Sequence, residues 1–166
     1  MSPRVDGRES RTGSASGPAD GGRDREATLR LMIALGRAYR ALERGVRRQL
    51  AERGLGLSEF AVLEALYHKG PMTLGEIRDR ILVTGASTTY VVKKLEERGL
   101  VRRVAGSDDQ RTVIGELTEN GRALVADVFP DHVEELRRLM SDLSLADKHA
   151  ATTLLRRLAE GASAHQ

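Results

Sequence analysis

Apolar and polar residues between positions 73 and 121 are spaced as two short helices followed by a β-hairpin. Thr73 and Glu76 form the pattern of a capping box, in which a hydroxyl and a carboxylate satisfy free N–H groups at a helix start. The first helix is therefore expected to begin at Thr73, and the chain to turn at 83–85 before the second helix. Apolar positions at helical spacing predict the buried face of the second helix: Thr88, Val91, Val92 and Leu95.

A hairpin follows the second helix. Gly99 stands where a helix commonly ends in the left-handed conformation that glycine accepts. Residues 100–105 and 112–117 are rich in Val, Ile and Thr, which favours strands, and the polar residues 106–111 separate them. Thr118 is of a type that caps helices, so another helix is expected to begin there. The pattern predicts a β wing between two helices.

Longer amphipathic helices flank this centre. Residues 24 or 25 to about 53 carry a broad apolar stripe, which the glycines at 54–56 end, and a helix of that length spans ~43 Å. Ser58 is expected to cap the next helix, which runs to Gly70. Residues 1–23 lack apolar periodicity and are expected to form a disordered tail.

The helices after the wing complete the pattern. The segment from Thr118 to Met140 contains Pro130, which is expected to kink the helix near residues 126–129 or to divide it. Ser144 with Asp147 predicts the start of the last helix. Both ends of the chain thus carry more apolar helix surface than a monomer covers, which indicates an oligomer, most commonly a two-fold dimer.

Composition narrows the class of protein. The 166 residues amount to about one domain. The chain has no cysteine, which excludes disulfides and thiolate chemistry. It also has neither an apolar run that spans a bilayer nor the apolar centre of a signal peptide, so a soluble, cytoplasmic protein with no membrane partner is expected.

Motifs of catalysis are missing from the sequence. It contains no Gly-x-Ser-x-Gly elbow, phosphate-cradling glycine loop or zinc-protease motif, so no enzyme and no cofactor are expected. His132 and Glu135 have the spacing of metal ligands on a helix, but without a second such pair no metal site is predicted. His132 is expected to be a surface or interface imidazole.

The outward positions of the second helix carry small hydroxyls, a phenol and two cations, which fit the base edges and phosphates of a major groove. The net charge is only +3, yet six basic residues oppose four acidic ones between Lys93 and Arg111. Charge alone favours a solvated surface, whereas the helix-turn-helix and wing context favours phosphate binding. Including one turn residue and one wing residue, the predicted DNA contacts are Thr84, Ala86, Ser87, Thr89, Tyr90, Lys93, Lys94 and Arg103.

The chain resembles the MarR-type winged helix-turn-helix transcriptional regulators over roughly residues 27–161. The resemblance is carried by TGASTTYVVKKLEERGLVRR and by the wing segment that runs from Asp109-Gln110-Arg111 to Glu116-Leu117-Thr118-Glu119-Asn120-Gly121-Arg122. It implies a mainly α fold with a small β wing, a winged helix-turn-helix flanked by dimerisation helices. The implied division places dimerisation helices at 24–56 and 122–163 and a DNA-binding lobe at 57–121.

The resemblance also implies partners. These are a homodimer and a pseudo-palindromic double-stranded DNA operator, with Arg111 at the wing tip in a minor groove and Asp109 holding it. On physical grounds alone, Asp109 would be a turn residue and Arg111 a solvated cation. Gln110 replaces an arginine that is common in the family, and Tyr90 and Lys93 also depart from it, so the operator is expected to differ from those of relatives.

A closer likeness, in LGLSEFAVLEALYHKGPMTLGEI, is to a subgroup that senses phenols and quinones. Without cysteine, sensing has to be reversible, and the protein is expected to be a repressor released by a small aromatic ligand. Tyr39, Arg40, Tyr67 and His68 are the candidate effector-binding residues, although both tyrosines are also explained as core aromatics. Two alternatives stay open: a winged-helix module that binds another protein, and a DNA regulator without an effector.

Overall fold

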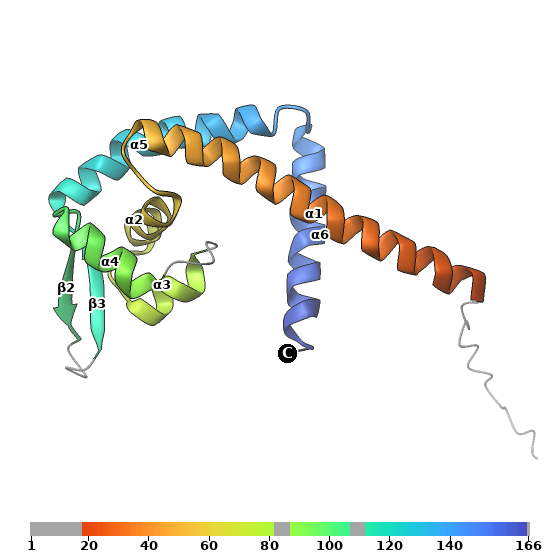
Figure 1. The fold of residues 1–166 in the computed structure, drawn as a ribbon, viewed down its shortest axis with the longest axis horizontal. Coiled ribbons are helices and arrows are strands. Elements are labelled where there is room, and N and C mark those ends of the chain that lie inside the picture. The colour runs from red at the N-terminus through yellow and green to blue at the C-terminus, as the bar shows by residue number, and fades with distance from the viewer. Residues whose placement is uncertain (1–17, 82–86, 107–111, 166) are drawn as a thin grey trace, which may run out of the picture. The chain divides into compact units, whose positions relative to one another are not determined.

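The computed structural model describes residues 18–81, 87–106 and 112–165 and is mainly α-helical, with a small antiparallel sheet (Figure 1). The fold class predicted from the sequence is confirmed. The chain divides into two compact units, residues 1–40 and 41–166. The elements are α1 (Pro18–Glu52), α2 (Leu57–Lys69), β1 (Met72–Thr73), α3 (Leu74–Arg80), α4 (Thr88–Glu97), β2 (Val101–Ala105), β3 (Val113–Leu117), α5 (Glu119–Leu139) and α6 (Leu145–Ser163).

Helix α1 begins at Pro18, several residues before the position that the apolar stripe predicts. Proline is favoured in a first helical turn, where its missing N–H costs nothing, whereas Gly21 and Gly22 weaken the helical pattern in the sequence. Residues 1–17 of the predicted tail lie outside the described residues. The helix ends at Glu52, close to the predicted end near residue 53, and Gly54 follows with φ +66°.

Helix α2 is capped by Gly56, not by Ser58 as the sequence suggested. The Glu59 carboxylate accepts a hydrogen bond from the Gly56 backbone N–H at 2.7 Å, and this supplies the side-chain half of a capping box. Gly70, with φ +82°, follows the helix. The buried face of α2 consists of Glu59, Phe60, Val62, Leu63 and Leu66.

Helices α3 and α4 form as the capping and spacing patterns predict. The Thr73 hydroxyl accepts from the Glu76 N–H at 3.2 Å, while the Glu76 carboxylate accepts from the Thr73 N–H at 2.8 Å. The predicted inward residues of α4 are all buried, namely Thr88, Val91, Val92 and Leu95. The predicted turn at 83–85 lies outside the described residues.

The sheet contains a strand that the sequence did not indicate. β1 pairs with β3, and β3 pairs with β2, both antiparallel, in the order β1-β3-β2. Met72 stands opposite Gly115 and Thr73 opposite Ile114. Two residues between Pro71 and a helix cap carry no alternation, so only the tertiary pairing identifies them as a strand.

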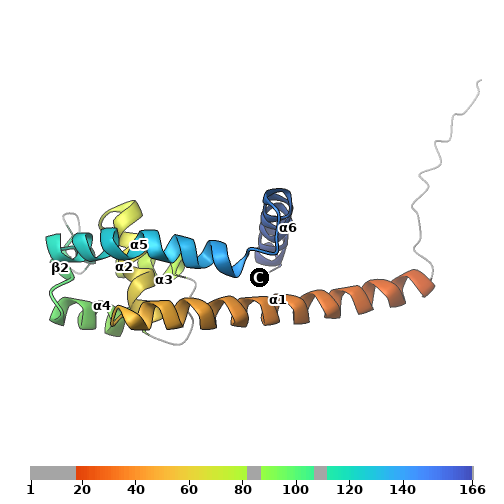
Figure 2. The same cartoon turned by 90° about the horizontal axis from the view of Figure 1, so that it is seen from above.

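Helix α5 continues through Pro130, so of the two outcomes predicted for this segment, a kink or a division into two helices, the division does not occur. Both Pro130 and Ala126, whose carbonyl loses its helical N–H partner, lie on the exposed side, where that carbonyl is open to solvent. Helix α6 starts with the predicted Ser144–Asp147 capping box. Every residue of α6 is at least partly exposed, and Figures 1 and 2 show α6 beyond the end of α5, away from α4 and the sheet.

The second unit has one apolar core, to which α2, α3, α4 and α5 all contribute. Its largest fully buried side chains include Phe60, Leu63 and Leu95. His132 of α5 is buried with 7% of its surface exposed, and its ring lies 4.7 Å from that of Phe60, so the predicted surface imidazole is a core residue. Within the described part of the chain, no helix is long and apolar enough to cross a membrane.

Candidate nucleic-acid interface

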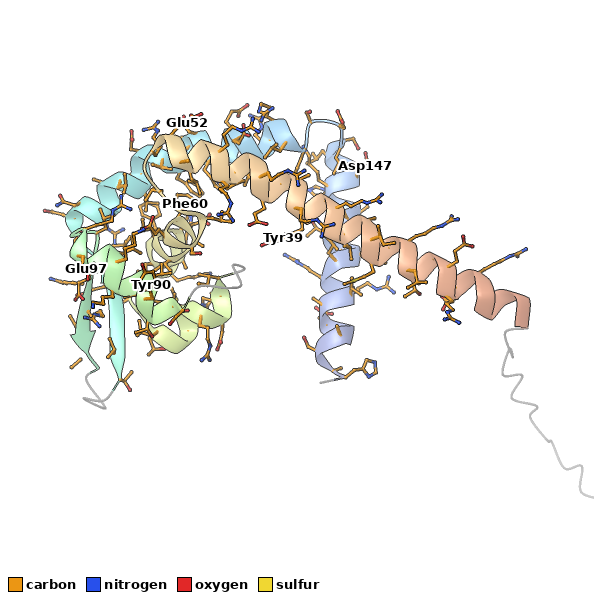
Figure 3. The ribbon with its side chains drawn as sticks, viewed as in Figure 1. Tyr39, Glu52, Phe60, Tyr90, Glu97 and Asp147 are labelled. Atoms are coloured by element: carbon orange, nitrogen blue, oxygen red, sulfur yellow. The ribbon has the colours of Figure 1, made fainter. Side chains whose placement is uncertain are left out.

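The outward side of α4 presents the side chains that the sequence assigned to DNA. Ser87, Thr89, Tyr90, Lys93 and Lys94 are exposed, and the buried side of the helix anchors it to the core. Tyr90, labelled on α4 in Figure 3, is 65% exposed and is therefore not a packing residue of its own unit. Thr84 and Ala86 lie outside the described residues.

One flank of α4 is held against α2 by charge. The Glu59 carboxylate is buried, with Lys94 Nζ 3.1 Å from its Oε1 and Arg98 Nη1 3.2 Å from its Oε2. Burial opposes ionisation of Glu59, but the Gly56 N–H and the two cations outweigh it and keep its pKa below the ordinary value. Lys94 therefore has an acidic partner within the fold.

The other flank of α4 is held to the wing. Arg103 of β2 donates to Glu96 at 2.7 Å, and this bond lowers the pKa of the Glu96 carboxyl. On the neighbouring strand position, Arg102 pairs with Glu116 across the sheet. The predicted DNA contact Arg103 thus also fixes the wing to α4.

Lys93 is the less constrained cation of α4. Its Nζ lies 3.9 Å from the Glu97 carboxylate, the limit of an ion pair, and both side chains are more than 60% exposed. An exposed pair at that distance contributes little energy. Lys93 can therefore turn toward an external anion.

A close joint connects the end of α4 to the start of α5. The Thr118 hydroxyl donates to the Gly99 carbonyl at 2.7 Å and accepts from the Gly121 N–H at 3.0 Å. The Thr118 N–H donates to the Leu100 carbonyl at 3.1 Å. A Cβ on Gly121 would lie 2.0 Å from the Leu100 oxygen, so only glycine allows this approach.

The wing tip, predicted to enter a minor groove, lies outside the described residues: Asp109, Gln110 and Arg111. The strands that carry it are described up to Gly106 and from Thr112, where the Gly106 N–H donates to the Thr112 carbonyl at 2.8 Å. The hairpin therefore closes just before its tip.

The predicted effector residues belong to different units. Tyr39 and Arg40 lie in the first unit, and Tyr67 and His68 lie in the second. Tyr67 is half-buried, with the Arg122 guanidinium 5.7 Å above its ring. The His68 ring lies 4.9 Å from that of Phe129, so Tyr67 and His68 join an aromatic cluster between α2 and α5.

Sequence reasoning missed several residues around α4. Glu59, Glu96 and Arg98 were not identified, because their pairing depends on how α4 packs on α2 and β2. A hollow of about 310 Å³ where α3 meets α4 was also missed, and it is lined by Leu74, Gly75, Arg78, Ser87, Thr88 and Thr89.

Among the described residues, no group of three His, Asp or Glu side chains is arranged to hold a metal ion.

Comparison with known proteins agrees with this geometry. The model of the MarR family matches residues 55–113. The HTH-type transcriptional regulator MhqR of Bacillus subtilis (strain 168) is 42% identical over 133 residues, which cover 80% of this chain and 92% of MhqR. The uncharacterised HTH-type regulator YkoM of the same organism is 33% identical, over 80% of this chain and 86% of YkoM.

Solved structures share the fold. BpsR of Bordetella bronchiseptica, described with the regulation of its DNA binding by 6-hydroxynicotinic acid, is 26% identical with a TM-score of 0.71, over 78% of this chain and 98% of BpsR. Sco3205 of Streptomyces coelicolor, a MarR family regulator solved with DNA, is 24% identical with a TM-score of 0.72, over 80% of this chain and 86% of Sco3205. At that identity, Sco3205 supports the fold alone.

Proposed function

Because the chain belongs to the MarR family of DNA-binding transcriptional regulators, we propose that it acts as a homodimeric repressor in the cytoplasm. Each subunit places α4 in the major groove of one half of a pseudo-palindromic operator, with half-sites about one helical turn apart. The wing lies beside it, with Arg111 in the minor groove. A small aromatic ligand releases the repressor from DNA.

The observation that carries the DNA-binding face is the two-sided character of α4. Its apolar side is buried, while its outward side offers hydroxyls, a phenol and Lys93 to the solvent. Tyr90 presents an apolar ring that can contact a thymine methyl, and Ser87 and Thr89 offer hydroxyls to base edges or phosphates. No enzyme function is needed to explain these groups.

The homodimer is supported by apolar surface that one chain leaves uncovered. On α1, residues Leu29, Met32 and Ile33 are each more than half exposed. At 3.6 residues per turn, these three side chains lie on one stripe about 100° wide, whereas the exposed Leu31 lies on the other side of the helix. On α6, further exposed leucines are Leu145, Leu154, Leu155 and Leu158. A second copy supplies matching surfaces by symmetry.

The aromatic effector is supported by two observations. BpsR, a structural relative, is described as regulated by 6-hydroxynicotinic acid, a small aromatic acid. In this chain, aromatic rings and the Arg122 guanidinium gather between α2 and α5 beside Tyr67 and His68. Without cysteine, the ligand binds without a covalent bond.

The test is fluorescence anisotropy on DNA from upstream of the protein's own gene, with competitor DNA and ~0.1 M salt. We expect a competitor-resistant complex in the nanomolar range. Lys93→Ala should weaken it and reduce the salt dependence by about one phosphate contact, a slope change of ~0.9, and Arg111→Ala should do likewise. Lys69→Ala, at the exposed end of α2, is the control and should change neither quantity.

The outcomes separate the alternatives. Absence of any competitor-resistant complex favours a protein-interaction module and refutes DNA binding by this face. Equal affinities for the wild type and Lys93→Ala refute the assignment of α4. A complex that no phenol or aromatic acid weakens, with no change in melting temperature, favours a regulator without an effector.

A further inference from the structure

Glu59 is a buried carboxylate of α2 that faces the basic flank of α4. Its side chain is only 7% exposed, and its Oε2 accepts from the Gly56 N–H at 2.7 Å. Lys94 and Arg98 lie four residues apart and therefore on the same side of α4. Their charged groups approach the two carboxylate oxygens at 3.1 and 3.2 Å.

The carboxylate of this contact is buried, whereas its two cations remain partly exposed to solvent. Glu59 is buried, whereas the side chains of Lys94 and Arg98 are 51% and 34% exposed. Within the described residues, the buried Oε1 has no hydrogen-bond donor of good geometry, so the charge of Lys94 is what neutralises it. Removing a cation from a buried carboxylate is costly, because the remaining charge is left uncompensated.

A DNA phosphate competes poorly for such a cation. Phosphates on DNA are in water and already surrounded by condensed counterions, so a lysine that moves to one gains mainly the entropy of ion release. To reach a phosphate, Lys94 would have to leave the buried Glu59 carboxylate, whose Oε1 has no other cation to replace it in the part of the chain that the structure describes. The two cations and one carboxylate together leave one net positive charge facing the solvent on this flank.

We propose that Glu59 is a positioning residue that holds Lys94 and Arg98 against α2 and so withholds Lys94 from the DNA phosphates. This inference rests on the proposed DNA-binding function of α4. It deepens that function by separating the two neighbouring lysines: Lys93 contacts phosphate, and Lys94 orients the helix. With fewer phosphate contacts, a larger share of the affinity comes from base edges, which favours the operator over other DNA.

The experiment measures the slope of log affinity against log salt concentration for operator DNA and for unrelated DNA. Lys94→Met should leave the slope unchanged, because Lys94 contacts no phosphate in the wild type. Glu59→Gln keeps an oxygen for the Gly56 N–H but frees the cations. It should steepen the slope by about 0.9 per cation that reaches a phosphate, and lower the ratio of operator to nonspecific affinity.

A double-mutant cycle shows whether Glu59 acts through Lys94. In the Lys94→Met background, Glu59→Gln should steepen the slope less than it does in the wild type. Glu97→Gln is the matched control. It also removes one negative charge near α4, but Glu97 is exposed and pairs with Lys93, not with Lys94. Its effect should be the same in both backgrounds. Circular dichroism verifies that each variant is folded.

Three results overturn the inference alone while the wild type still binds its operator. These are a loss of about one phosphate contact in Lys94→Met, an unchanged slope in Glu59→Gln, and equal steepening by Glu59→Gln in both backgrounds. The Lys94→Met result tests the inference even if the Glu59→Gln protein does not fold. A wild-type protein without a competitor-resistant complex instead refutes the proposed function, and this inference with it.

Discussion

Replacing Gly121 by alanine tests the joint between α4 and α5. The new Cβ would lie 2.0 Å from the Leu100 oxygen and 2.9 Å from its carbonyl carbon. Non-bonded carbon contacts are most favourable near 3.5–4.0 Å, so the Leu100 peptide has to retreat by more than about 1 Å. That peptide's carbonyl accepts from the Thr118 N–H, and its movement breaks the hydrogen bond that ties the N-cap residue of α5 to Leu100.

Three contributions determine how much Gly121→Ala changes the free energy of unfolding. Overpacking that shifts backbone costs about 1–3 kcal/mol. Loss of the Thr118–Leu100 hydrogen bond adds about 1 kcal/mol. Alanine's better helix propensity returns about 0.8–1.0 kcal/mol. We expect the Gly121→Ala protein to be less stable by about 2 kcal/mol, which lowers the melting temperature by roughly 4–8 °C for a chain of this size.

The assay is urea and thermal unfolding followed by circular dichroism, at one fixed protein concentration because assembly affects stability. Gly161→Ala in α6 is the control. A Cβ there meets nothing within 4 Å, so that variant should be as stable as the wild type or slightly more stable. If Gly121→Ala unfolds at the same urea concentration as Gly161→Ala, the close approach of Gly121 to Leu100 does not exist in solution.

Two further predictions concern His132 and α6. Burial lowers the pKa of His132 below its ordinary value of 6.5, with Glu64 opposing, so the unfolded chain binds that proton more readily. The contribution of neutral His132 to the free energy of unfolding is therefore fully present above pH 6.5 and should fall on acidification toward the lowered pKa, by at most about 1.4 kcal/mol per pH unit. Urea unfolding at pH 7.5 and 5.5 measures this loss, and an equal loss in a His132→Gln protein would contradict the prediction. For α6, Leu158→Glu should convert a dimer into an 18.2 kDa monomer by light scattering, whereas Thr153→Glu on the opposite side should not; a monomeric wild type excludes the homodimer.

Local signals in the sequence were sufficient for most of the elements. The hydroxyl and carboxylate pairs at Thr73 and Ser144 specify helix starts through neighbours three residues away, and both capping boxes form. The buried face of α4 follows from helical spacing alone. At α2, the side-chain type of Ser58 predicts the wrong cap, because Glu59 accepts from the Gly56 N–H through its carboxylate and Gly56 is the N-cap.

The features that the sequence did not reveal depend on tertiary packing. Lys94 and Lys93 are adjacent in the chain, yet only Lys94 is on the flank that meets Glu59. Helical spacing places both outside the core and does not indicate which neighbouring element each one meets. A polar residue on an amphipathic helix usually lies at the surface or an interface, which is the prediction for His132, but its ring packs on Phe60 instead.

Thr73, the second residue of strand β1, has two structural roles. Its side chain caps α3, while its backbone position pairs with Ile114 in the wing. A displacement of the wing strands is thus transmitted directly to the first turn of the helix-turn-helix. The wing and the start of α3 are thus anchored at one residue, whose side chain serves the helix and whose backbone serves the sheet.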